Sequence, residues 1–296
     1  MRKFLLWLLA VVITLGSAFY QRLTGPTYHY RGRVEIAESQ IKFRLPRSHE
    51  ITSDCEVALT VSNPEVSGRI AYKRFKTADS WTELPLEREE GRLVGRLPRQ
   101  PTAGKLAYKV FLSSEVKELS LSGEDPVIIR FKGAVPLPIL ICHVVIMFGA
   151  MLLSTRAGLA ALDRRSSPRR LAVLTVSFLF IGGFILGPLV QKYAFGAWWT
   201  GFPLGFDLTD NKTLIAMVGW VAALFAGRGG KPARGWVVAA SILMLIVFLI
   251  PHSLLGSELK YADAGPPGSS ASAVRGASTQ GCGQSPSGRL TVPLNS

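Results

Sequence analysis

Apolar residues are concentrated in five long runs that contain no charged residue. The runs cover residues 4–20, 134–155, 171–191, 213–227 and 235–257. A bilayer core of ~30 Å needs about 20 residues of helix, and four of the runs come close to that length or exceed it. The run 213–227 is shorter and needs tilted neighbours or a locally thinned bilayer. The pattern predicts a membrane α-helical bundle with five transmembrane helices.

The first run has two interpretations. Arg2 and Lys3 precede it, and it ends in the small residues Gly16, Ser17 and Ala18. A basic start, an apolar stretch and a small-residue end are also the features of a cleaved secretory signal peptide. Residues 1–27 are therefore expected to be a signal anchor or a signal peptide. Both export the segment that follows.

Residues 28–133 have a different pattern, in which apolar and polar positions alternate. Seven segments show this period of two, namely 28–36, 41–45, 57–61, 69–75, 93–97, 106–112 and 127–131. Such alternation indicates half-buried strands, and turn residues such as those at 62–64 separate them. The segment is expected to form an all-β domain between the first and second helices. By analogy of fold, we expect an immunoglobulin-like antiparallel β-sandwich.

Basic residues cluster in three short segments beside the apolar runs. They are Arg2 and Lys3; Arg156, Arg164, Arg165, Arg169 and Arg170; and Arg228, Lys231 and Arg234. Asp163 is the one acidic residue among them. Because positive loops stay inside, the N-terminus is expected in the cytoplasm of a bacterial cell, with residues 28–133 and the C-terminus outside. The net charge of +14 then reflects topology, and no nucleic-acid partner is expected.

The remaining chain divides into two parts. Residues 134–261 hold the last four apolar runs and are expected to form a four-helix membrane domain. Residues 262–296 are rich in Gly, Ser, Ala and Pro, lack apolar periodicity and are predicted to be a disordered tail.

Candidate chemistry lies at the expected outer face of the bundle. The loop between the third and fourth membrane runs carries Trp198, Trp199 and Asp207 among several glycines. Aromatic residues at headgroup depth form interfacial belts, whereas the glycines and Pro203 favour a shaped loop. Thr209 or Asp210 is expected to cap the helix that follows.

Two histidines fall within the membrane runs. His143 has Met147 four residues on, and so on the same helical face. His252 follows Pro251 near the end of the last run. Ionisable groups inside a membrane often mark a functional site, although ordinary packing with one hydrogen bond also explains His143.

The loop resembles a known one. Gly196-Ala197-Trp198-Trp199 and Phe206-Asp207, followed by an apolar helix, resemble the tryptophan-rich loop of heme-handling cytochrome c assembly proteins (CcmC/CcsA type). The family's pattern is roughly W-G-x-x-W-x-W-D, and here Phe195 and Phe206 replace tryptophans. The resemblance implies heme b as a cofactor, with His143, His252, Trp198, Trp199 and Asp207 as its binding residues.

No catalytic or metal-binding constellation is evident in the sequence. Paired carboxylates, a nucleophile–base pair and a metal-ligand cluster are all missing from it. We therefore expect a non-enzymatic accessory, assembly or sensing subunit with membrane or periplasmic protein partners as well as the lipid bilayer. One alternative is heme binding or heme handling. A second is a small-solute transporter or lipid-active enzyme that uses Asp207, His252 and Glu258 at the outer interface.

Overall fold

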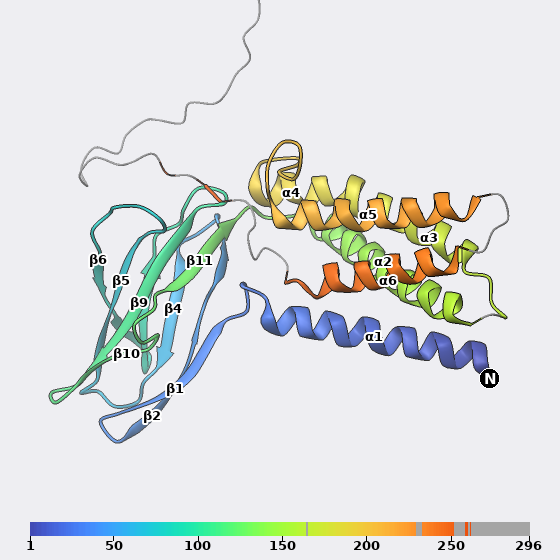
Figure 1. The fold of residues 1–296 in the computed structure, drawn as a ribbon. Coiled ribbons are helices and arrows are strands. Elements are labelled where there is room, and N and C mark those ends of the chain that lie inside the picture. The colour runs from blue at the N-terminus through green and yellow to red at the C-terminus, as the bar shows by residue number, and fades with distance from the viewer. Residues whose placement is uncertain (164, 229–232, 252–257, 260, 262–296) are drawn as a thin grey trace, which may run out of the picture. The chain divides into compact units, whose positions relative to one another are not determined.

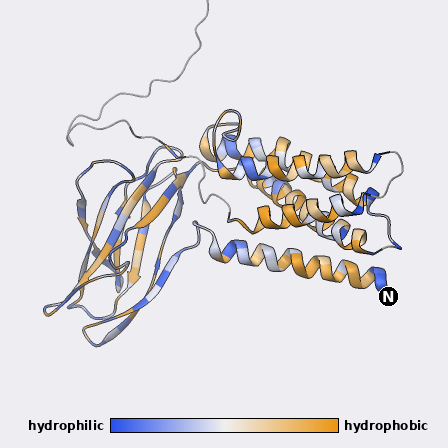
Figure 2. Cartoon of the chain, viewed as in Figure 1, coloured by the Kyte–Doolittle hydropathy of each residue, from blue (hydrophilic) through white to orange (hydrophobic). Residues whose placement is uncertain are grey.

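The computed structural model describes residues 1–163, 165–228, 233–251, 258–259 and 261. Helix α1 (Arg2–Thr24) is followed in the chain by a β domain, and the remaining helices follow that domain (Figure 1). Apolar positions dominate the helices, whereas polar and apolar positions alternate along the strands (Figure 2). The predicted combination of a helical part and an all-β part is confirmed.

The β domain contains three sheets. The largest has the order β3 (Ser48–Glu50), β11 (Val127–Lys132), β9 (Lys105–Ser113), β5 (Ser67–Arg74) and β6 (Thr82–Pro85), with β10 (Glu118–Ser120) also paired to β9. A second sheet has the order β4 (Cys55–Thr60), β8 (Arg92–Leu97) and β7 (Glu87–Glu89). The hairpin of β1 (Tyr30–Ile36) and β2 (Ser39–Leu45) is the third, and β2 lies beside β4.

Strand pairing is antiparallel among the described strands except between β3 and β11, which are parallel. Each of the seven predicted segments coincides with a strand, namely β1, β2, β4, β5, β8, β9 and β11. The strands that were not predicted have three or four residues. Such lengths are too short for a period of two to be recognised in the sequence.

The three sheets enclose one hydrophobic core. The side chains of Phe43, Leu59, Leu97, Ile129 and Phe131 come from all three sheets and are almost completely buried. They occupy alternate positions of their strands, which is why the alternating sequence predicted them. A buried polar contact belongs to this core, because the Tyr108 hydroxyl donates to the carbonyl oxygen of Pro46 at 2.7 Å.

Within the described residues, three helices are long and apolar enough to cross a membrane. They are α1, α2 (Leu137–Leu162) and the continuous helix Arg169–Phe195. The last of these comprises α3 (Arg169–Leu179), the π-helical segment η1 (Phe180–Leu186) and α4 (Gly187–Phe195). Helix α6 (Arg234–Leu249) is apolar but shorter, and α5 (Leu208–Ala226) begins with polar residues. Membrane embedding is thus supported, while five spans remain a prediction.

Helix α2 is the central helix of the bundle and packs against α1, α3 and α6. Its second half presents small residues to these neighbours, including Ala150, Ala157 and Gly158, which allow close approach of helices. Trp220 of α5 is fully buried, and its indole nitrogen lies 3.2 Å from the Met244 sulfur.

Basic residues predicted from charge bias to lie inside the cell also hold the bundle together. The Arg234 guanidinium donates to the carbonyl oxygens of Ala161, in the last turn of α2, and of Asp163 and Ser166, just beyond it, at 2.8–3.2 Å. Arg2 forms an ion pair with Asp163 at 2.9 Å, which fixes the start of α1 beside the end of α2. The contacts of Arg234 satisfy carbonyl groups that a helix end leaves unpaired.

Candidate functional site

The site begins at a widened turn of helix. Segment η1 is π-helical, and its Gly182 and Gly183 bring α2 and α5 close together. A Cβ atom at Gly182 would lie 2.7 Å from the Met147 sulfur, and one at Gly183 would lie 2.5 Å from the Thr213 methyl group. Single turns of π-helix inside α-helices occur frequently at functional sites.

His143 is held by this widened turn. Its Nδ1 lies 3.0 Å from the carbonyl oxygen of Gly182. A carbonyl oxygen only accepts, so Nδ1 carries the proton in this contact. In the neutral ring, Nε2 then keeps its lone pair and can accept a further hydrogen bond.

A pocket of about 90 Å³ opens beside His143. It lies among α2, η1, α4 and the beginning of α5, and polar side chains line it from α2, from α4 and from the beginning of α5. Its lining residues are His143, Met147, Gly183, Gly187, Val190, Gln191, Phe195, Asp207, Thr209, Asp210 and Thr213. One water needs roughly 10–15 Å³ of such volume, so the pocket has room for a ligand of about six heavy atoms.

The structure assigns the cap of α5 to a different residue from the predicted Thr209 or Asp210. The helix cap is Asp207, whose Oδ1 accepts from the backbone N–H of Thr209 at 2.7 Å. Asp210 is one turn further on, and its Oδ2 accepts from the Thr200 N–H at 2.7 Å. The prediction of Thr209 or Asp210 as the cap is therefore wrong. Asp207 initiates α5, and Asp210 anchors the preceding loop to it.

The loop itself is compact. Asn211 accepts the Phe202 N–H at 2.7 Å, and the Asp207 N–H donates to the Thr200 carbonyl oxygen at 2.9 Å. The Gln191 side-chain amide donates to the Thr200 hydroxyl, which links the end of α4 to the same loop. Gln191 and Thr200 were not predicted as site residues. In the sequence, Gln191 stands out only as an amide inside an otherwise apolar run, and no pattern marks Thr200.

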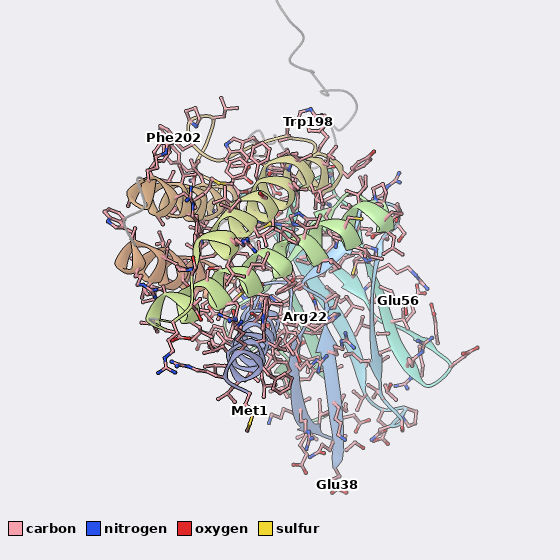
Figure 3. The ribbon with its side chains drawn as sticks, turned by 90° about the vertical axis from the view of Figure 1, so that its right-hand side faces the viewer. Met1, Arg22, Glu38, Glu56, Trp198 and Phe202 are labelled. Carbon is pink, nitrogen blue, oxygen red and sulfur yellow. The ribbon has the colours of Figure 1, made fainter. Side chains whose placement is uncertain are left out.

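The two tryptophans of the loop lie in different surroundings. Trp199 stacks on Phe184 of η1 with ring centroids 5.6 Å apart, and its indole N–H donates to the Phe202 carbonyl oxygen at 3.1 Å. Trp198 is exposed, with the Lys192 ammonium 5.8 Å from its ring centroid. Trp198 and Phe202 lie near the edge of the molecule in Figure 3. The structure thus brings His143 and Asp207 to one pocket, and places neither tryptophan in its lining.

The other predicted ligand, His252, lies outside the described residues. The described pocket does not fit a heme, because sites for ligands of that size measure roughly 300–1,000 Å³. Met147 does not complete the ligand set, since residues four apart on one helix approach from the same side. A heme site would depend on His252.

The β domain contacts the helices beside this pocket. The N–H of Gly133, which follows β11, donates to the Ala194 carbonyl oxygen at 2.9 Å. Gly133 is required here, because a Cβ atom would overlap the Tyr193 carbonyl oxygen. The Arg130 guanidinium of β11 lies 5.3 Å from the ring centroid of Phe195, a pocket residue. Burial lowers the pKa of Arg130, and the nearby charge of Asp207 opposes that shift.

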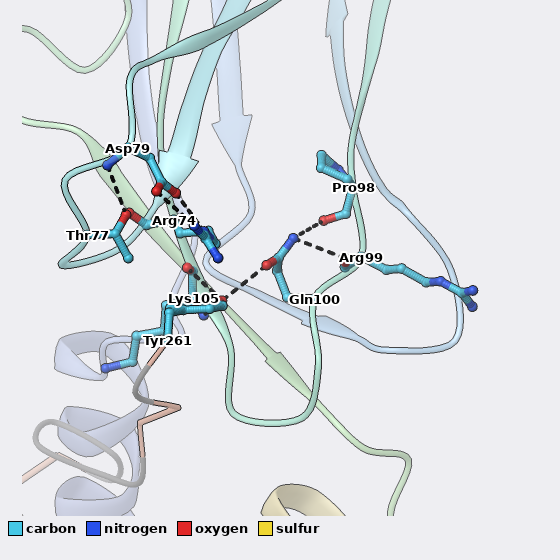
Figure 4. A network of polar contacts seen from close by, with 8 residues as sticks. All are labelled: Arg74, Thr77, Asp79, Pro98, Arg99, Gln100, Lys105 and Tyr261. Atoms are coloured by element: carbon cyan, nitrogen blue, oxygen red, sulfur yellow. Dashed lines mark hydrogen bonds and ion pairs between the residues drawn. The ribbon is translucent and has the colours of Figure 1, made fainter. Parts of the chain in front are cut away.

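A second connection follows α6. Glu258 forms ion pairs with Lys105 at 2.8 Å and with Lys76 at 3.2 Å, both in the β domain. The Tyr261 hydroxyl accepts the Lys105 N–H at 3.0 Å and donates to Gln100, within the network of Figure 4. Glu258 is thus held by lysines and is not among the pocket residues.

No metal site could be identified among the described residues, because they contain no group of three His, Cys, Asp or Glu side chains able to hold an ion. Comparisons with protein-family models, with curated proteins and with solved structures found no match. The site must therefore be interpreted from its own geometry.

Proposed function

We propose that this chain is a non-enzymatic sensing or assembly subunit of a bacterial cytoplasmic membrane. In this proposal the exported β domain binds a protein partner, and the polar pocket of the helical bundle is coupled to that binding. The observation that carries the proposal is the direct connection between the two parts. Strand β11 leads into α2 through residues 133–136, and Gly133 is bonded to the end of α4 beside the pocket.

The chemistry of the site supports a role without catalysis. Asp207 and Asp210 each accept a backbone N–H, so they serve as structural acceptors. His143 uses Nδ1 to hold the Gly182 carbonyl. A general base needs a partner whose proton it can take, and a nucleophile needs an adjacent base. The hydroxyl groups of the described pocket lining belong to Thr209 and Thr213, and the Thr213 hydroxyl donates to the Thr209 carbonyl oxygen at 3.0 Å.

Finer features of the fold belong to the same proposal. We infer an immunoglobulin-like sandwich, since β2 lies beside the β4–β8–β7 sheet and that layer shares a core with the β6–β5–β9–β11 layer. The parallel pairing of a short strand with the last strand supports this inference. We also infer five spans, with the N-terminus in the cytoplasm and residues 28–133 outside, on the distribution of basic residues.

The pocket favours a second candidate function, the binding of a small polar solute at the outer interface. His143, Gln191 and Asp207 supply both donors and acceptors around a volume of about 90 Å³. Glu258 takes no part in it, because Lys105 and Lys76 hold its carboxylate. This candidate is compatible with the first, since a small ligand is one signal that a sensing subunit can detect.

The proposal is tested by measuring whether contact with a partner protein depends on the pocket residues. Trp81 is exposed at the start of β6, and β6 is an edge strand, the kind of strand that pairs with a partner. A benzophenone amino acid in place of Trp81 should form a defined cross-linked protein adduct in whole cells. We expect His143→Ala and Asp210→Asn to reduce the adduct, normalised to the abundance of the full chain, at least about fivefold, which corresponds to roughly 1 kcal/mol.

Cys142→Ala is the matched control, because Cys142 neighbours His143 on α2 and is exposed. It should leave the adduct unchanged. An adduct that the pocket substitutions do not alter would contradict the coupling. A turnover reaction that is lost in His143→Ala would replace the non-enzymatic assignment.

A further inference from the structure

The β1–β2 hairpin carries an unusual pairing of like charges. Its register places Arg31 opposite Arg44 and Arg33 opposite Lys42. Residues directly opposite in an antiparallel pair point to the same face. All four basic side chains are exposed, whereas the alternating residues Ile41, Phe43 and Leu45 are buried in the core. The outer face of the hairpin is therefore a basic face, defined here as Arg31, Arg33, Lys42 and Arg44.

These charges are not neutralised within the described part of the chain. Its ion pairs involve none of the four basic residues. Arg31 lies over the Tyr28 ring at 4.9 Å, and Arg44 contacts the His29 Nδ1 at 3.2 Å. Glu35 shares the face but lies opposite Gln40. Like charges directly opposite destabilise a hairpin, and an external anion would reverse that effect.

The position of the hairpin identifies the anion. Only residues 25–29 separate α1, a membrane-spanning helix, from β1. Arg22 lies in the last turn of α1 and, with Arg44 and Arg31, adds to the effect of burial in lowering the pKa of His29. Figure 3 shows Arg22 well separated from Glu38, which marks the far tip of the hairpin. The base of the hairpin thus lies close to the end of a span.

Tyrosine and basic side chains together are typical of a segment at the membrane surface. Tyr28 and Tyr30 stand at the hairpin base, and Tyr30 is exposed and stacks on Phe43. We propose that the basic face of the β1–β2 hairpin binds anionic phospholipid headgroups of the membrane that α1 crosses. The contact would orient the β domain on the bilayer. It rests on the charge register and on the position of the hairpin next to α1, and it is independent of the pocket.

Amide exchange of the full chain in nanodiscs tests this assignment. Peptides covering residues 30–45 should exchange at least about fivefold more slowly in discs of phosphatidylcholine with 30 % phosphatidylglycerol than in discs of phosphatidylcholine alone. A fivefold change is about the gain in binding expected for one basic residue near an anionic surface. The difference should shrink in about 0.5 M salt, where charges are screened. Equal exchange in both discs would overturn the proposal.

The variant Arg33→Glu separates lipid binding from hairpin stability. It places a carboxylate opposite Lys42 and so should slow exchange in phosphatidylcholine, yet abolish the response to phosphatidylglycerol. If the basic residues only stabilised the hairpin, Arg33→Glu would not both slow exchange in phosphatidylcholine and abolish the response to phosphatidylglycerol. Lys117→Glu, which makes the same charge change at an exposed residue outside the hairpin, should keep the response.

A further experiment tests whether the partner of the basic face is an acidic protein. A soluble polyglutamate peptide is added to discs of phosphatidylcholine alone. Protection of residues 30–45 by this peptide, without protection by phosphatidylglycerol, would assign the basic face to an acidic protein and overturn the lipid assignment. Protection of the same residues in discs with 30 % phosphatidylglycerol supports the lipid assignment.

Discussion

His143 Nδ1 lies 3.0 Å from the carbonyl oxygen of Gly182, inside the one described stretch of π-helix. The same carbonyl also accepts the Gly187 N–H of the π-helical turn, and its second lone pair is available to the side chain. An imidazole inside a membrane bundle in turn needs a hydrogen-bond partner. The carbonyl therefore satisfies the imidazole, and the contact fixes the ring at the edge of the pocket.

Replacing the histidine should destabilise the bundle. His143→Ala removes one hydrogen bond, while the Gly182 carbonyl keeps the Gly187 N–H as a donor, so the cost should be about 0.5–1.5 kcal/mol. Thermal unfolding of the full chain in nanodiscs should show a lower midpoint than wild type. Cys142→Ala, one residue earlier on the same helix, should stay within about 0.5 kcal/mol. Equal midpoints for His143→Ala and wild type would show that the contact contributes nothing.

The two aspartates of the loop should be separable by mutation. Asp210→Ala removes the acceptor of the Thr200 N–H and should make the loop 196–207 open to proteases. Asp207→Ala removes the cap of α5 together with a charge close to Arg130, and should lower stability by at least about 1 kcal/mol. Limited proteolysis beside thermal unfolding distinguishes these effects. If both variants were cleaved in the loop at the same rate, the assigned division of tasks would be wrong.

The β domain should lose stability in acid through one ion pair. Arg74 binds both oxygens of Asp79 at 2.6 and 2.8 Å, and this hydrogen bonding lowers the pKa of Asp79 against the effect of burial. A lowered carboxyl pKa stabilises the fold above the unfolded value of about 3.9, and the contribution disappears as pH falls through the folded value. The pair is partly exposed, so we expect about 1 kcal/mol or less.

Calorimetric unfolding between pH 7 and pH 2.5 measures this contribution. Asp79→Asn should unfold at a lower temperature than wild type at pH 7, and the two should converge in acid. Glu65→Gln serves as the control, because Glu65 is exposed and makes no ion pair in the described part of the chain. A difference in unfolding temperature between wild type and Asp79→Asn that grows as the pH falls would contradict the assignment.

Periodicity predicted most of the fold because burial imposes it directly. The alternation that predicted a strand at 106–112 places Leu106, Tyr108, Val110 and Leu112 in the core. The uncharged run 134–155 likewise marks most of α2. In contrast, the short strands at 48–50 and 87–89 pair through their backbones, and side-chain pattern does not record such pairing.

The pocket was only partly predictable, for a physical reason. His143 and Asp207 stood out as ionisable residues beside apolar runs. Gln191 and Thr200 meet Asp210 only because α4 ends at Gly196 with a φ of 80°, and the loop then folds back onto α5. The π-helical turn also shifts the register of α4 relative to α3. A constant period of 3.6 residues therefore misplaces every side chain beyond it.

The coupling between the β domain and the pocket is tested most directly by amide exchange of the loop 196–207 in the variant Gly133→Ala. A Cβ atom at this position overlaps the Tyr193 carbonyl and should break the bond to Ala194. Gly235→Ala is the matched control, since its Cβ atom would meet nothing within 4 Å. We predict that loop exchange accelerates about fivefold or more in Gly133→Ala, as expected for one lost hydrogen bond, and stays unchanged in Gly235→Ala. Wild-type loop exchange in Gly133→Ala, or equal acceleration in both variants, would contradict the coupling.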